Sequence, residues 1–220
     1  MSRNDIVGEK YMRKNCKIPD SVIRRIPKYI RYINKCLNEE VHYVTSTDIA
    51  DSIGISSGTV RNDFNFFGLF GNQGKGYETW KLKVELEKIM GINLRRRAVV
   101  IGTEGLGKTI VESYRLDDIG YRIDAVFRAG NGYTGNTIRG IPVYDIHRID
   151  DYLKSNMIDV YILAVTDDMT QNMADFVVSR GAKAILNCTN TDILADSHVF
   201  VENLQPVDSL LRISYFMAQS

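Results

Sequence analysis

The sequence contains few of the residues from which metal sites and disulfide frameworks are built. It has three cysteines, Cys16, Cys36 and Cys188, which lie far apart, and three histidines. An odd, scattered set of cysteines is typical of reduced thiols in a cytoplasm, whereas secreted disulfide scaffolds use dense, even sets. The histidines have no ligand spacing to one another or to the cysteines. We therefore expect a cytoplasmic protein without a bound metal.

Long apolar runs and a strong net charge are also missing. No stretch of about 18 apolar residues occurs, so no membrane span is expected, and the start of the chain lacks the apolar core of a signal peptide. The net charge of +1 excludes a polycation. Any affinity for nucleic acid must therefore come from a local patch. Residues 1–37 offer one, with ten lysines and arginines against three acidic residues.

The hydrophobic pattern changes along the chain. After Pro27, apolar residues recur at helical spacing, as Tyr29, Ile30, Ile33 and Leu37. Beyond residue 91, short apolar runs alternate with helical stretches, and the runs suit buried strands at 97–102, 123–127, 160–165, 184–187 and 199–201. Such alternation predicts an α/β fold with a parallel, doubly wound sheet.

Residues 47–64 have the spacing of a helix-turn-helix. Gly54 permits the left-handed residue of a tight turn, and a serine follows as the cap of the second helix. The amino-terminal part of such a helix meets base edges in the major groove, where arginine bonds guanine and asparagine bonds adenine. Glycines between residues 71 and 76 predict a β-wing. The DNA-binding residues that we expect are Ser46, Ser56, Ser57, Thr59, Arg61, Asn62, Lys75 and Tyr77.

Residues 102–107, Gly-Thr-Glu-Gly-Leu-Gly, lie after a predicted strand and before a helix, as in a dinucleotide-binding fingerprint. The middle glycine, where backbone approaches the pyrophosphate, is replaced by Glu104, whose carboxylate repels phosphate. About 20 residues further on, the place of the ribose-binding acid holds Arg128, which suits a 2′-phosphate instead. We predict weakened binding of NAD(H), with NADP(H) as the alternative. The cofactor-binding residues that we expect are Gly102, Thr103, Glu104, Gly105, Leu106, Gly107, Arg128, Val165 and Thr166.

Three domains follow from these patterns. Residues 1–90 are predicted to form a winged-helix DNA-binding domain, and residues 91–203 a Rossmann-like sensor domain. Residues 204–220 are predicted to form a carboxy-terminal helix. Residues 210–217 are too apolar for a free tail, and a helix-turn-helix reader usually needs two half-sites, so we also expect a homodimer on double-stranded DNA.

The sequence resembles the Rex family of redox-sensing transcriptional repressors from about residue 18 to 216. The most specific match is Thr-Val-Arg-Asn-Asp-Phe-Asn-Phe-Phe-Gly at 59–68, and further matches lie at 71–77, 135–144, 185–187 and 215–216. The resemblance implies a homodimer with paired Rossmann domains and swapped carboxy-terminal helices. It also implies binding to operators near genes of fermentation and respiration, released when NADH replaces NAD. Departures from the family pattern fall at Glu104, Arg128, Thr166, Cys188, Asn190 and Gln205.

Three functions remain open at this point. The first is a Rex-like repressor that responds to a dinucleotide. The second is a paralog that binds DNA but no longer senses NADH. The third is a small nicotinamide-dependent oxidoreductase, but no Ser-His-Asp, Cys-His or Lys-Tyr set has catalytic spacing. Asp167 and Asp168 are interpreted as the polar cap of the following helix. We therefore predict no catalytic residues and no enzyme.

Overall fold

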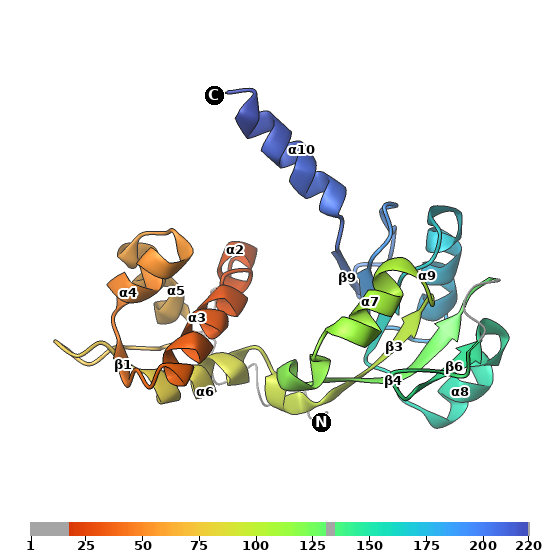
Figure 1. Ribbon diagram of the computed structural model, residues 1–220, viewed down its shortest axis with the longest axis horizontal. Coiled ribbons are helices and arrows are strands. Elements are labelled where there is room, and N and C mark those ends of the chain that lie inside the picture. Colours follow the sequence, from red (N-terminus) through yellow and green to blue (C-terminus); the bar gives the residue numbers. More distant parts are fainter. Residues whose placement is uncertain (1–17, 131–134, 220) are drawn as a thin grey trace. The chain divides into compact units, whose positions relative to one another are not determined.

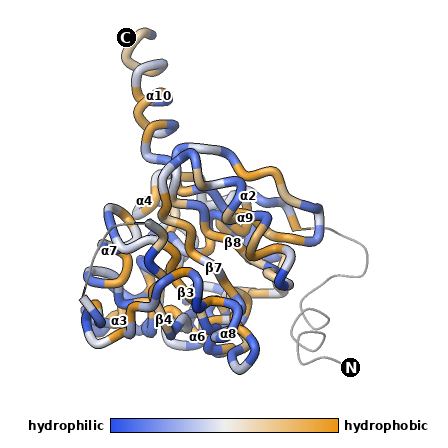
Figure 2. The backbone as a smooth tube through the Cα atoms, turned by 90° about the vertical axis from the view of Figure 1, so that its right-hand side faces the viewer, coloured by the Kyte–Doolittle hydropathy of each residue, from blue (hydrophilic) through white to orange (hydrophobic). Residues whose placement is uncertain are grey.

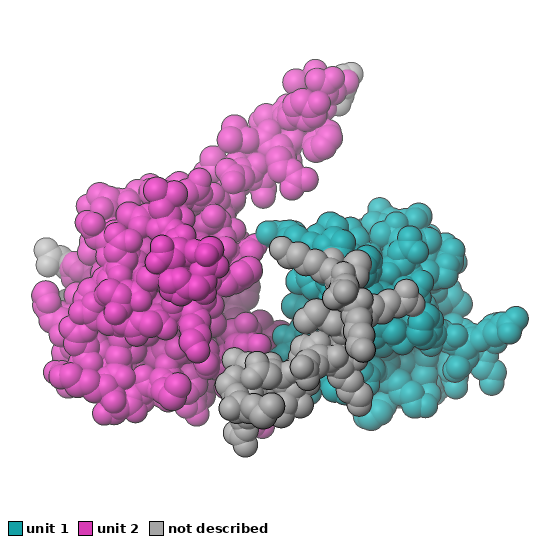
Figure 3. Space-filling model, turned by 180° about the vertical axis from the view of Figure 1, so that it is seen from behind, with its two compact units in different colours: residues 1–94 teal, residues 95–220 magenta. Residues whose placement is uncertain are grey.

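A computed structural model describes residues 18–130 and 135–219, and the chain divides into two compact units, 1–94 and 95–220 (Figure 3). Cys16 and the basic residues up to Lys17 lie outside the described part. No helix among the described residues is long and apolar enough to cross a membrane. Each unit has a hydrophobic core of its own.

The first unit is a helical domain with a small two-stranded sheet. Its core holds the fully buried side chains of Tyr29, Ile33, Ile49, Phe64 and Leu86. The elements, in chain order, are α2 (Asp20–Ile23), α3 (Ile26–Asn38), β1 (Tyr43–Val44), α4 (Ser46–Ile53), α5 (Ser57–Phe66), β2 (Tyr77–Glu78) and α6 (Thr79–Ile89).

Local capping fixes the helix-turn-helix. Thr45 and Asp48 form a reciprocal capping box that starts α4. Gly54 ends α4 in the left-handed conformation, with φ 73°, which favours glycine because it has no Cβ. The Ser56 side chain accepts a hydrogen bond from the Thr59 backbone and starts α5. The predicted turn at Gly54 and the predicted serine cap of the second helix are confirmed.

The wing lies between α5 and α6. β1 pairs with β2 in antiparallel register, and an isolated bridge joins Asn72 to Gly76. Gly76 is required there, because a Cβ at this position would lie 2.3 Å from the carbonyl oxygen of Val44. The close approach of the two backbones sets the base of the loop that carries Lys75.

The second unit contains a seven-stranded sheet with the order β5-β6-β4-β3-β7-β8-β9 (Figure 1). All neighbouring strands run parallel except β5 and β6. This is the order of a doubly wound dinucleotide-binding fold, flanked by one antiparallel edge strand. The strands are β3 (Arg96–Ile101), β4 (Tyr121–Arg128), β5 (Thr137–Ile138), β6 (Ile141–Asp145), β7 (Val160–Leu163), β8 (Ala184–Asn187) and β9 (Phe200–Asn203).

The strand expected over residues 160–165 ends earlier, at Leu163. Just beyond the strand, the backbone of Ala164 passes very close to Gly102. A Cβ on Gly102 would lie only 1.9 Å from the carbonyl oxygen of Ala164. The chain leaves the sheet at Ala164, so Val165 and Thr166 belong to the following loop and not to the strand.

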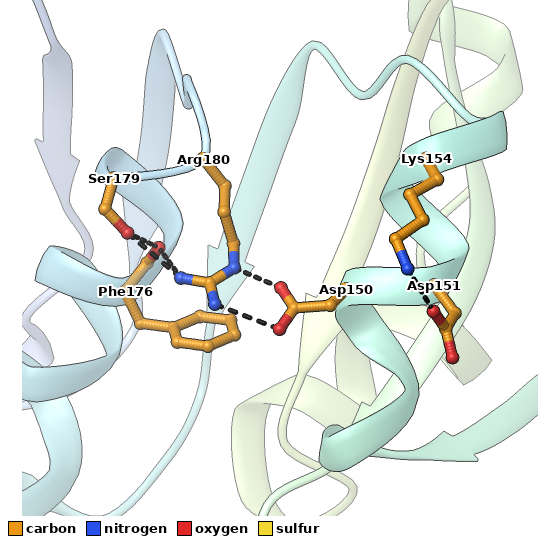
Figure 4. Close-up of polar contacts among 6 residues, drawn as sticks. All are labelled: Asp150, Asp151, Lys154, Phe176, Ser179 and Arg180. Carbon is orange, nitrogen blue, oxygen red and sulfur yellow. Dashed lines mark hydrogen bonds and ion pairs between the residues drawn. The ribbon is translucent and has the colours of Figure 1, made fainter.

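Helices cover both faces of the sheet. α7 (Gly105–Ser113) packs on one face, while α8 (Ile149–Ser155) and α9 (Thr170–Val178) pack on the other. Arg180 ties the last two together: it binds Asp150 with two hydrogen bonds and lies 3.5 Å from the centre of the Phe176 ring (Figure 4).

The helix α10 (Pro206–Met217) extends away from the sheet of the second unit with no buried residue (Figures 1 and 2). Its large apolar side chains are 51–72% exposed. Short 3₁₀ turns complete the fold at Ile92–Leu94, Leu116–Ile119, Ile146–Arg148 and Asp167–Met169.

Candidate DNA interface and nucleotide pocket

The helix α5 has an anchored face and an exposed face. Val60, Asp63 and Phe64 are buried, with at most 2% of each residue exposed. Arg61 and Asn62 lie on the other side of the helix and are exposed. Two side chains suited to base edges are therefore presented by a helix whose opposite side is fixed in the core.

The anchor is a buried ionic network that sequence reasoning missed. Arg25 donates to both carboxylate oxygens of Asp63, at 2.6 and 2.8 Å, and the Tyr29 hydroxyl donates to the same carboxylate at 2.5 Å. Burial, followed by the hydrogen bond to Asp63, raises the pKa of Tyr29. The hydrogen bond to Asp63 likewise raises the pKa of the Arg25 guanidinium. One signal was available: Asp63 lies three residues after Val60, on the apolar side of the helix.

Two of the expected DNA-binding residues meet between α4 and α5. Arg61 donates from Nη1 to the Ser46 hydroxyl at 3.0 Å. Ser56 and Thr59 form the cap of α5, with their hydroxyls 2.9 Å apart, and Ser57 is the first, half-buried residue of the helix. These serines and threonine thus have structural roles at the helix ends, beside the exposed Arg61.

The two expected wing residues lie in different surroundings. Lys75 is exposed, and its ammonium lies 6.0 Å from the centre of the Tyr43 ring. Tyr77 is half-buried, and its ring packs edge-on against Phe64 with centres 5.1 Å apart. Burial raises the pKa of Tyr77. Its ring therefore packs between β2 and α5, so Tyr77 has a structural role in addition to any contact with DNA.

The second unit has a cavity of about 770 Å³ at the carboxyl ends of β3, β4, β7 and β8. Ligands of this fold bind at that edge, where the strand order reverses. Seven of the expected residues line the cavity: Gly102, Thr103, Glu104, Gly105, Leu106, Val165 and Thr166. Gly107 and Arg128 do not line it.

Gly107 serves the packing of α7 on the sheet. A Cβ there would lie 2.7 Å from the carbonyl oxygen of Gly102 and 2.9 Å from the Cβ of Ala164. This close packing of helix on strand is the role of the third glycine of the fingerprint. The backbone turn of a dinucleotide site is therefore present.

Glu104 fits a pyrophosphate less well than the glycine that a dinucleotide fingerprint has at this position. It is the exposed N-cap residue of α7, and its side chain makes no capping hydrogen bond. The first N–H groups of a helix and its dipole favour an anion at this end. Glu104 thus adds a negative charge next to the end of the helix that would hold a phosphate, but its side chain does not bond to that end.

Arg128 is the last residue of β4, and its Nη2 donates to Asp145 on the neighbouring strand β6 at 3.0 Å. The parallel register pairs these two residues directly. The backbone N–H of His147, and then Arg128, hold the pKa of Asp145 below its usual value. The sheet edge thus retains a carboxylate, but one strand further out than the fingerprint places it.

A second buried polar network supports the cavity from β8. Asn187 accepts at 2.8 Å from the hydroxyl of Thr189, which accepts at 3.0 Å from Thr170. Asn187 also donates to Asn203 at 2.9 Å. Between them, Cys188 lines the cavity, and burial raises the pKa of its thiol to about 11. Sequence reasoning did not predict this network, which fixes the loop after β8.

In the part of the chain that the structure describes, no three histidine, cysteine, aspartate or glutamate side chains are grouped to hold a metal ion.

Comparison with known families gives two matches that follow the two units. Residues 17–65 match a family described as the N-terminus of putative DNA-binding proteins. Residues 93–191 match the CoA binding domain. The fold class predicted from the sequence, a DNA-binding domain followed by a Rossmann-like domain, is confirmed.

The chain is also similar to whole proteins. It is 34% identical to the redox-sensing transcriptional repressor Rex of Clostridium tetani, over 94% of this chain and 98% of the relative. It is 36% identical to Rex of Caldicellulosiruptor bescii, over 93% and 94% of the two chains.

Solved structures give the same result. One of the repressor RSP in complex with beta-NAD+ and operator DNA matches with a TM-score of 0.86 and 32% identity, over 93% of this chain and 94% of that chain. A structure of RSP with beta-NADH matches with a TM-score of 0.81 and 30% identity, over 93% and 96%. The chain belongs to the Rex family of redox-sensing transcriptional repressors.

Proposed function

We propose that this protein is a transcriptional repressor that binds operator DNA through α5 and the wing and responds to a nicotinamide dinucleotide in the second unit. The observation that carries the proposal is the division of α5, with Asp63 anchored in the core and Arg61 and Asn62 exposed beside it. The similar RSP structure was determined with operator DNA and beta-NAD+.

Each side chain has a separate task in this proposal. Arg61, oriented by Ser46, bonds a guanine edge, and Asn62 bonds an adenine edge in the major groove. Lys75 on the wing contacts phosphate, which adds affinity but no base specificity. The winged-helix region of residues 1–90 reads DNA, and the Rossmann-like region of residues 91–203 binds the ligand.

The DNA-binding proposal is tested with DNA selected by the protein from a randomised pool of duplexes. Arg61→Ala is expected to weaken binding to the selected DNA by about 1–3 kcal/mol and to relax preference at one base pair. Lys154→Ala is the matched control, because Lys154 lies on α8 and pairs there with Asp151. Unchanged affinity for Arg61→Ala in fluorescence anisotropy would show that α5 is not the reading helix.

The ligand is proposed to act by binding and not by turnover. Curated relatives are named repressors. A cysteine acts as a nucleophile only as the thiolate, and burial raises the pKa of Cys188, the cysteine that lines the cavity, which disfavours that form. Incubation with NADH or NADPH should change DNA affinity without oxidising the cofactor. Steady oxidation of the cofactor when carbonyl compounds are supplied as hydride acceptors would favour the oxidoreductase instead.

We also propose a homodimer. An apolar groove of about 530 Å³ lies on the sheet face that carries α7, and Tyr114, Ile162 and Phe200 are among its lining residues. The exposed apolar side chains of α10 need a cover, since a helix apolar on most sides is stable only when buried. A second copy of the chain would cover both apolar surfaces, the groove and the exposed side of α10. Light scattering at micromolar concentration tests this, and a monomer mass contradicts it.

A further inference from the structure

The end of β4 is where this fold distinguishes one dinucleotide from another. Arg128 ends the strand, and the next two residues, Ala129 and Gly130, line the cavity. The Arg128 side chain is 28% exposed, and it directly precedes these two lining residues in the chain. A residue in this position recognises the adenosine ribose in dinucleotide sites of this fold.

Arg128 reverses the hydrogen-bonding character of this position, because it donates where a carboxylate would accept. In NAD sites a carboxylate here accepts hydrogen bonds from the ribose hydroxyls. A guanidinium has five N–H donors and no acceptor, so it cannot take that role. It matches a phosphate, which it can bind with two parallel hydrogen bonds. A phosphate monoester carries about −1.5 to −2 charges at pH 7.

Asp145 holds the guanidinium at the edge of the sheet. Its carboxylate accepts from the backbone N–H of His147 at 3.1 Å and from Arg128 at 3.0 Å. The carboxylate is therefore fixed by the chain that follows β6, and Arg128 is positioned by the carboxylate. A pre-positioned arginine loses less side-chain freedom when it binds an anion than a mobile one.

We propose that the cavity selects a dinucleotide with a 2′-phosphate, NADP(H), over NAD(H), and that Arg128 is the residue that binds this phosphate. The inference rests on the proposed function, because it takes the cavity to be a dinucleotide site. It concerns the identity of the ligand and leaves DNA binding by α5 unchanged.

Glu104 affects the affinity but not the preference. NADH and NADPH carry the same pyrophosphate, so the carboxylate at the start of α7 weakens both by the same factor. The ratio of their dissociation constants then depends on the surroundings of the 2′-position alone. Absolute affinity and selectivity are therefore controlled by two separate residues, which two separate substitutions can test.

The test is calorimetry on the full chain with two pairs of probes, NADPH against NADH and 2′,5′-ADP against 5′-AMP. Within each pair the 2′-phosphate is the difference at issue. We expect the phosphorylated member to bind at least tenfold more tightly, and Arg128→Asp to bring the ratio to one or reverse it. Arg128→Lys retains the charge, so it should weaken the preference without reversing it.

Three further variants complete the test. Glu104→Gln should tighten NADH and NADPH by similar factors and leave their ratio unchanged. Asp145→Asn keeps an oxygen that can accept from Arg128 but removes the negative charge that repels a phosphate, so it should increase the preference for 2′,5′-ADP. Lys154→Ala should change neither quantity. Thermal unfolding of every variant identifies any that fail to fold, and Asp145→Asn keeps the proposal testable if Arg128→Asp does not fold.

Equal affinity for both members of each pair, or no heat from 2′,5′-ADP at millimolar concentration, would overturn the inference. So would a ratio that Arg128→Asp leaves unchanged. Anisotropy with the selected DNA on the same samples separates the two failures. If DNA binding persists while the 2′-phosphate has no effect, the ligand assignment alone is wrong.

Discussion

Replacing Asp63 with alanine is expected to destabilise the first unit by about 3–5 kcal/mol, the cost of removing one partner from a buried ion pair. The substitution leaves the Arg25 guanidinium without its two bonds to the carboxylate. It also leaves the hydroxyl of Tyr29, a residue with no exposed surface, without its acceptor. An unsatisfied buried hydroxyl alone costs about 1–3 kcal/mol.

The structure limits this cost. The Arg25 side chain is 24% exposed, so it can turn partly toward water and the loss should fall in the lower half of the range. Even so, about 3 kcal/mol is a large share of the 5–15 kcal/mol that stabilises a typical domain. The triple change Asp63→Leu, Arg25→Met and Tyr29→Phe removes all three polar partners together and should recover most of the stability.

The chain offers a matched control. Arg24 and Asp20 form an ion pair at the same 2.6 Å distance, but their side chains are 60% and 74% exposed. Asp20→Ala should therefore cost about 0–1 kcal/mol. Urea unfolding followed by the fluorescence of Trp80, the single tryptophan, reports on the first unit. If Asp63→Ala shifts the transition no more than Asp20→Ala, the buried network does not hold α5.

Four further predictions concern other sites. Lys75→Ala should weaken binding to all duplexes similarly and reduce the slope of log affinity against log salt by about one; anisotropy at several salt concentrations measures this, and an unchanged slope removes the wing from the interface. Phe216→Asp, on α10, should convert the dimer to a monomer in light scattering, whereas a retained dimer would exclude α10 from the interface. Because burial raises the pKa of Cys188 to about 11, its alkylation by iodoacetamide, read by peptide mass spectrometry, should be slow at pH 8 and accelerate toward pH 11; rapid labelling at pH 8 contradicts this. The pKa of Tyr29 is raised above its ordinary value of 10.0, so the unfolded state releases this proton first as the pH rises. The stability of the first unit should be fully present below pH 10 and decline above it, and Tyr29→Phe should flatten the decline in urea midpoints.

Local signals were sufficient to predict much of the fold. The capping residues before α4 and α5 and the glycine between them act within a few positions of one another, so the sequence reveals them. Continuous apolar runs identified β3, β4, β7 and β8. The run Ile141–Asp145 was not predicted as a strand, because all five of its residues are half-buried and it contains a proline. Its partner β5 has only two residues.

The contacts that hold the sites in place could not be predicted, because they join distant parts of the chain. Asp63 meets Arg25 and Tyr29 across 38 and 34 positions. The pairing of Arg128 with Asp145 depends on the register of β4 on β6, which no local pattern specifies. The residue types at these positions were visible in the sequence, but their partners were set by tertiary packing.

The division of α5 also affects how this repressor can change in evolution. Folding depends on the side chains that face inward, Val60, Asp63 and Phe64, whereas Arg61 and Asn62 face outward and carry no core packing. Exposed positions of this kind usually tolerate substitution within about 0.5 kcal/mol. New operator sequences can therefore be acquired, by natural drift or by laboratory selection at two codons, without a compensating stabilising mutation elsewhere.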